Sequence, residues 1–133
     1  MTSRTITAAP SGTWRLGDLT VHRMGFGAMR LTEGPGGVPS DRERVIGVLA
    51  IAGDGREAGA ASGRADGPAV LAAARAHGVS PAQIRLAWTL HQGPHLLAIP
   101  GTGDPAHLVE NVAAGAVRLT PAEVAALDAE AAG

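Results

Sequence analysis

Residues 96–111 constrain the fold of this chain most strongly, because they read as a strand, a glycine turn and a helix start in direct succession. The apolar run Leu96–Ile99 lies between two proline–glycine pairs, which is typical of a buried strand in a parallel sheet. Asp104 followed by Pro105 then predicts an N-cap and the first residue of a helix. The sequence therefore places a helix N-terminus directly after a glycine turn.

Such a turn is suited to binding an anion, because the first N–H groups of a helix have no partner and lie at the positive end of its dipole. Gly101–Ala106 also fits the G-x-G-x-x-A form of the dinucleotide-binding fingerprint. Two features argue against that reading: no second strand is predicted after the helix, and the acidic residue at the required spacing, Asp128, falls in a helical pattern. In (β/α)₈ barrels, phosphates bind at the loops after the last strands, and this arrangement fits better.

The motif Ile99–Thr102, together with the residues of the following helix start, resembles the C-terminal cofactor-binding segment of the aldo-keto reductases. This resemblance implies that the segment holds the adenosine 2′-phosphate and the adenine of NADP(H). It implies cofactor-binding roles for five residues here: Gly101 and Thr102 at the phosphate, His107 beside it, and Glu110 and Asn111 near the adenine. From the residues alone, an ordinary loop with a capped helix is the alternative.

The N-terminal part predicts a β-hairpin, in which residues 13–16 and 19–22 flank a Gly17-Asp18 turn and Trp14 packs on one face. The glycine-rich segment Met24–Arg30 follows. This order resembles the N-terminus of the same family, where a hairpin closes the bottom of the barrel. The resemblance implies that the nicotinamide end of the cofactor lies near Gly27, Ala28 and Met29.

The remaining elements are predicted from capping and apolar spacing. A helix from about residue 40 to residue 51 resembles the family's first barrel helix, and further helices are expected over residues 68–77, 81–92 and from residue 121 onward. Within the second of these, Trp88 is expected in the core. Residues 52–67 have no apolar period and are expected to form a flexible linker that replaces the missing barrel strands.

A complete (β/α)₈ barrel needs about 250 residues, and this chain has 133. We therefore expect an α/β fold that is a partial, TIM-barrel-like (β/α)₈ structure, with residues 1–133 forming one incomplete domain. Neighbouring first and last strands are expected in it, since these strands adjoin in a closed barrel.

Composition excludes several classes of function. The net charge is −1 with no basic cluster, which argues against nucleic acid and acidic membranes as partners. The chain has no cysteine, and residues 1–12 lack the apolar core of a secretory signal, so a cytoplasmic protein is expected.

His91 and His95 are four residues apart, but Gly93-Pro94 interrupts the helix between them, so no metal site is predicted. His22 and Asp54 are expected on the solvated surface.

All 11 basic residues other than histidine are arginine, so the sequence has no lysine, and it also has no tyrosine. The family mechanism uses a tyrosine as proton donor and a lysine that lowers the pKa of that phenol, so no catalytic residue is assigned here. We expect a reductase-like protein that keeps part of an NADP(H) site. The alternatives are a non-catalytic interaction or remnant protein that pairs through exposed strand edges, and a small Rossmann-like binder.

Overall fold

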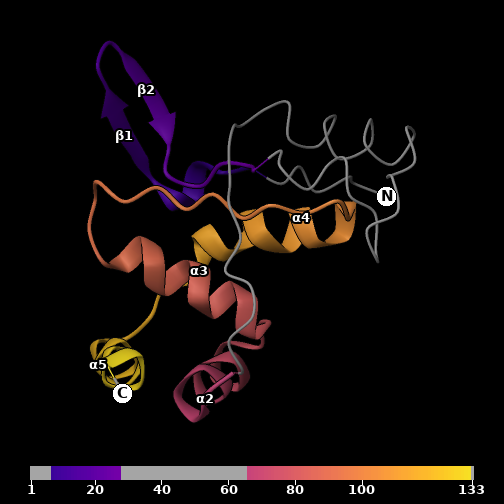
Figure 1. The fold of residues 1–133 in the computed structure, drawn as a ribbon, viewed down its shortest axis with the longest axis vertical. Coiled ribbons are helices and arrows are strands. Elements are labelled where there is room, and N and C mark those ends of the chain that lie inside the picture. The colour runs from indigo at the N-terminus through magenta and orange to yellow at the C-terminus, as the bar shows by residue number, and fades with distance from the viewer. Residues whose placement is uncertain (1–6, 28–65, 133) are drawn as a thin grey trace.

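The computed structural model describes residues 7–27 and 66–132 (Figure 1). In these ranges the chain forms a two-stranded hairpin, four α-helices and two short 3₁₀ helices. The hairpin extends from one end of the molecule, and α2 (Pro68–His77) and α5 (Pro121–Ala132) lie at the opposite end. Helices α3 (Pro81–His91) and α4 (Pro105–Ala113) lie between them.

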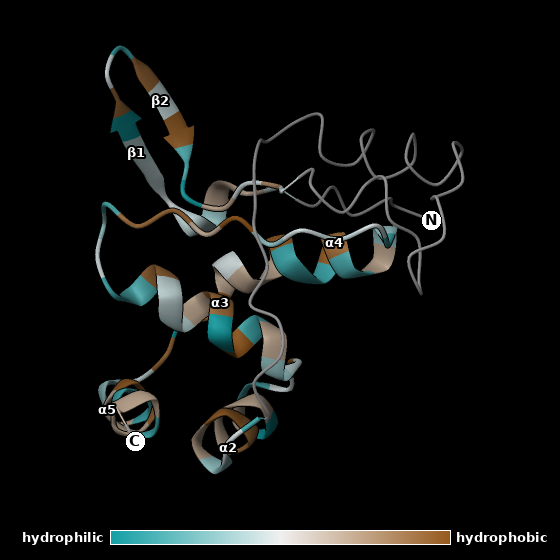
Figure 2. Ribbon diagram, viewed as in Figure 1, coloured by the Kyte–Doolittle hydropathy of each residue, from teal (hydrophilic) through white to brown (hydrophobic). Residues whose placement is uncertain are grey.

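The hairpin forms as predicted, from β1 (Thr13–Leu16) and β2 (Leu19–His22) in antiparallel register. Gly17 has a φ of 62° at the turn, a left-handed conformation that glycine adopts without strain. The hairpin projects away from the helices (Figure 2), and its residues Leu16 and Leu19 stay 48% and 63% exposed. The hairpin therefore contributes little to the core.

The segment after the hairpin lies beside the segment that precedes α4. Two isolated parallel bridges join them, Met24 to Ala98 and Gly27 to Gly101. The Gly25 N–H donates to the Ala98 carbonyl at 3.1 Å, and the Ala98 N–H donates to the Arg23 carbonyl at 2.9 Å. The predicted adjacency of the first and last strand segments is therefore confirmed, 74 residues apart in the sequence.

The predicted helix starts are confirmed by the caps. Ser80 and Gln83 form a reciprocal capping box at α3, and the Asp104 carboxylate accepts the Ala106 N–H at 2.8 Å at α4. Thr120 and Glu123 form the same kind of box at α5. At the other end of α2, Gly78 adopts a φ of 63° and ends the helix.

Two clusters of apolar side chains make the core. One joins the end of the hairpin segment to α3 and the two 3₁₀ helices, η1 (Ala9–Ser11) and η4 (Ala114–Ala116). Its buried members are Ala8, Met24, Leu86, Leu90, Ala98 and Ala114. The other joins α2, α3 and α5, and its buried members are Val70, Ala73, Ala74, Ile84 and Leu127. Helix α3 contributes to both clusters and is the central element of the described fold.

Gln83 adds a polar link between α3 and α4. Its side chain is buried, its Oε1 accepts the Ser80 N–H at 3.0 Å and its Nε2 donates to the Glu110 carbonyl at 2.9 Å. Both ends of this buried amide are therefore satisfied, and the two helices are held at one separation.

Two expectations need correction, and a third is refined. Leu96–Ile99 is not a buried strand: within it only Ala98 is buried and bridged, while Ile99 is 50% exposed, because the described residues cover one face of the segment. Trp88 packs against the second cluster as expected but at its edge: the ring is only partly buried, and its indole N–H donates to the Asp128 carboxylate at 2.7 Å. His22 is half-buried rather than solvated, and its Nδ1 is buried without a hydrogen-bond partner among the described residues.

Several expectations lie outside the described residues: the helix near residues 40–51, Asp54, and all of the linker 52–67 except Asp66 and Gly67. Ala28 and Met29 lie outside them too. No helix in the described ranges has the length and hydropathy needed to cross a membrane.

Candidate functional site

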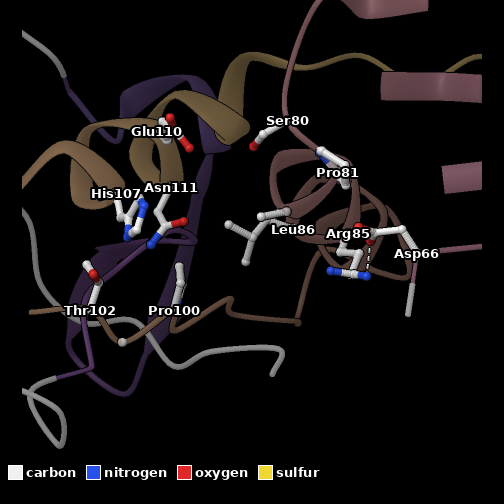
Figure 3. Close-up of a pocket in the computed structure, with 12 residues that line it drawn as sticks. Asp66, Ser80, Pro81, Arg85, Leu86, Pro100, Thr102, His107, Glu110 and Asn111 are labelled. Carbon is white, nitrogen blue, oxygen red and sulfur yellow. Dashed lines mark hydrogen bonds and ion pairs between the residues drawn. The ribbon is translucent and has the colours of Figure 1, made fainter. Parts of the chain in front are cut away.

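A cavity of about 410 Å³ opens between α3, the loop at residues 100–102 and α4 (Figure 3). Five of the residues predicted to bind the cofactor line it: Gly101, Thr102, His107, Glu110 and Asn111. The fold therefore brings the C-terminal set together on the wall of one cavity. The glycine turn and the start of α4 form one side of this cavity, and α3 forms the other.

Thr102 is the buried polar residue of the turn, with 8% of its surface exposed. Its Oγ1 accepts the Asp104 N–H at 3.0 Å, which fixes the side chain and leaves the hydroxyl hydrogen to donate to another group. The adjoining Gly101 is held by its parallel bridge to Gly27. A hydroxyl fixed beside a glycine backbone is a suitable donor for a phosphate oxygen.

The N-terminus of α4 supplies a further donor. Pro105 has no N–H, and the Ala106 N–H is occupied by the Asp104 carboxylate. The Leu108 N–H donates to the Asp104 carbonyl at 3.1 Å, whereas the His107 N–H has no partner among the described residues. One N–H at the positive end of the helix dipole thus stays available near the cavity.

Two side chains of α4 lie on the side of the turn. His107 and Asn111 lie next to each other above Thr102 and Pro100 (Figure 3). The Asn111 side chain makes no hydrogen bond with the described residues, so its amide can both donate and accept, as the edge of an adenine requires. Glu110 lines the cavity while its backbone carbonyl is held by Gln83.

The opposite wall brings in residues that the sequence reasoning did not select. Arg85 and Leu86 of α3 and its N-cap Ser80 line the cavity. Asp66 also lines it, and its carboxylate forms an ion pair with the Arg85 guanidinium. The helix predicted over residues 81–92 is present as α3, but Arg85 belongs to no motif that would mark it as a binding residue. Only the packing of α3 against α4 shows that its guanidinium reaches this cavity.

Of the N-terminal set, only Gly27 belongs to the described residues. It is bridged to Gly101 of the turn but is not among the described residues that line the cavity. Within residues 7–27 and 66–132, no group of three or more histidine, aspartate and glutamate side chains is placed to hold a metal ion. His95 instead packs its ring edge-on against Trp14, with the ring centroids 6.4 Å apart.

Comparison with known proteins decides the family. The model of the Aldo/keto reductase family matches residues 54–132, more than half of the chain, including α3, the turn and α4. This chain belongs to the aldo/keto reductase family. Family membership implies a (β/α)₈ barrel, and the described part of this aldo/keto reductase chain is a small α/β portion consistent with part of such a barrel.

Two curated relatives support the assignment. Aldo-keto reductase str7 from Strobilurus tenacellus is 49% identical over 51 residues, and pyridoxine 4-dehydrogenase from Escherichia coli strain K12 is 45% identical over 51 residues. Each match covers 38% of this chain, but only 15% and 18% of the respective relatives. The aldo/keto reductase chain therefore spans a small fraction of the length of these proteins.

No strand follows α4 in residues 114–132, and Asp128 lies in α5, so the Rossmann-like alternative lacks its βαβ unit.

Proposed function

We propose that this chain binds the adenosine 2′-phosphate end of NADP(H) in the cavity between α3 and α4. The observation that carries the proposal is the convergence of Thr102, the His107 N–H and the Asn111 amide on one cavity wall. The first two are donors for phosphate oxygens, and the third matches the donors and acceptors of an adenine edge.

Charge at the cavity also supports the proposal. Arg85 brings a permanent positive charge to the wall opposite the turn, where Asp66 holds its guanidinium. Arginine binds phosphate through a planar set of donors, so a phosphate entering the cavity competes with Asp66 for this group. We expect the affinity to be low, because the carboxylates of Asp66 and Glu110 lie on the same cavity.

Catalysis is the second part of the proposal. A tyrosine proton donor and its lysine are absent from the 133 residues, so we propose that this chain does not reduce carbonyls by the family mechanism. NADPH consumption should stay at the rate of a no-enzyme control with a panel of aldehydes. Turnover well above that control contradicts this part.

Calorimetric titration with adenosine 2′,5′-bisphosphate and with adenosine 5′-monophosphate tests the binding site without requiring the nicotinamide half. We expect the bisphosphate to bind more tightly, and Thr102→Val to weaken it by about tenfold, since a hydrogen bond to a charged group is lost. Thr20→Val, an exposed change on β2, is the matched control and should leave binding unchanged. No binding of either nucleotide at millimolar concentration would refute the proposal.

A further inference from the structure

Arg23 follows the hairpin directly and contacts three parts of the chain at once. We propose that Arg23 is the positioning residue that fixes residues 23–27 against residues 96–101. It thereby fixes the turn at residues 100–102 that lines the cavity. The link to the cofactor rests on the function proposed above. The link to the register of the two segments rests only on the contacts of Arg23.

The guanidinium of Arg23 is directed at backbone carbonyls. Its Nη2 donates to Gly93 at 2.6 Å and also to Leu90, its Nε donates to Leu96 at 3.2 Å, and its Nη1 lies 3.5 Å from the Ser11 carbonyl. The Leu90 carbonyl lies in the last turn of α3, where helix carbonyls lack partners and a positive charge is favourable. Only a planar, multiply donating side chain can serve these carbonyls together.

The backbone of Arg23 contacts the same region. Its N–H donates to the Gly12 carbonyl at 3.0 Å, and its carbonyl accepts the Ala98 N–H at 2.9 Å. The side chain thus holds Leu96 while the main chain holds Ala98, two residues further along the same segment. The next residue, Met24, is fully buried and bridged to Ala98.

This double attachment determines which residues of the turn face the cavity. A slip of one residue between paired segments moves each side chain to the opposite face. Gly101 is three residues beyond Ala98 and is bridged to Gly27, so the position of Thr102 depends on this register. Arg23 also joins the segment to the end of α3, the helix that forms the other wall of the cavity.

Arg118 provides a matched control. Its guanidinium donates to the carbonyls of Gly115 at 2.6 Å, Val117 at 3.2 Å and Pro10 at 2.7 Å, and therefore makes a similar number of bonds. It joins η1 to the segment after η4, and none of these bonds reaches residues 23–27 or 96–101. Loss of Arg118 removes comparable bonds but none that joins the two bridged segments directly.

The experiment compares Arg23→Lys, Arg23→Ala and Arg118→Ala by amide hydrogen exchange and by titration with adenosine 2′,5′-bisphosphate. We expect both Arg23 variants to speed exchange of the Gly25 and Ala98 N–H groups by about tenfold, with α5 unchanged, and to weaken binding by a similar factor. Lysine keeps the charge but not the planar donors, so it should not restore either value. Added guanidinium ion should partly restore both in Arg23→Ala.

The inference fails if Arg23→Lys leaves exchange at Gly25 and Ala98 unchanged, or if it speeds exchange equally throughout the chain. It fails as well if Arg118→Ala gives the same local pattern. Should Arg23→Ala not fold, Arg23→Lys alone decides between these outcomes. If the unmodified chain does not bind the bisphosphate, the proposed function fails, and the exchange comparison still decides the role of Arg23.

Discussion

At the scale of single residues, the cavity combines side chains from two sources. Thr102 and Asn111 belong to the segment whose sequence resembles the cofactor-binding segment of the family, so they could be selected from the sequence. Arg85 and Asp66 could not, because no local pattern distinguishes them from other charged surface residues. For Trp88, helical spacing correctly predicted packing against the core, but it did not predict the bond from the indole N–H to Asp128.

Arg85 should determine the preference for a phosphorylated ribose. We expect Arg85→Ala to weaken binding of adenosine 2′,5′-bisphosphate by about tenfold while adenosine 5′-monophosphate is nearly unaffected, because only the former brings a 2′-phosphate to the guanidinium. Calorimetry measures both constants. Arg75→Ala, an exposed change on α2 outside the cavity, is the control, and equal losses for the two nucleotides would contradict the prediction.

At the scale of elements, capping signals predicted the helices well because they are local. Ser80, Asp104 and Thr120 each use a side-chain oxygen to accept an N–H from their own helix, and each helix begins where that signal predicts. The predicted strand at Leu96–Ile99 was less accurate, since strand formation depends on partners elsewhere in the chain. Apolar composition alone does not supply those partners.

Helix α5 carries three acidic side chains that each bond to another element. The Glu130 carboxylate accepts the Ala69 N–H at 2.6 Å at the start of α2. A carboxylate oxygen of Glu123 lies 3.0 Å from Nε2 of His77, the last residue of α2. Asp128 accepts from α3 through Trp88. These contacts hold α5 across both ends of α2.

Acid should weaken this attachment. The bond from the Thr120 backbone N–H, followed by that from His77, lowers the pKa of Glu123 below its ordinary value of 4.5. A lowered folded-state pKa stabilises the fold above about pH 4.5, and this contribution is lost as the pH falls through the folded-state value. Glu123→Gln should remove that part of the pH dependence and cost less than about 1 kcal/mol at neutral pH, because the pair lies near the surface.

Denaturant unfolding followed from pH 3 to pH 7 measures this effect. Glu110→Gln is the matched control, since the Glu110 carbonyl and not its carboxylate holds Gln83. If the Glu123→Gln and unmodified curves stay parallel down to the lowest pH, Glu123 does not contribute in this way.

At the scale of the whole molecule, the fold is defined by a contact between two distant parts of the sequence. The family model matches residues 54–132 and does not include the hairpin or Gly27. The position of the N-terminal part therefore depends on the parallel bridges, and it agrees with the adjacency of first and last strands in a closed barrel. We further propose that residues 1–133 form one incomplete barrel domain. Pairing of an exposed edge with a second chain remains the alternative, because Ile99 leaves part of the bridged segment uncovered.

The most direct test is NMR detection of scalar couplings across the hydrogen bonds between the two segments. The account predicts a coupling from the Gly25 N–H to the Ala98 carbonyl and one from the Ala98 N–H to the Arg23 carbonyl. Both should be observed in a dilute sample in which the chain is monomeric. Absence of both couplings, with fast exchange of the two amides, would contradict the claim that these two segments lie side by side.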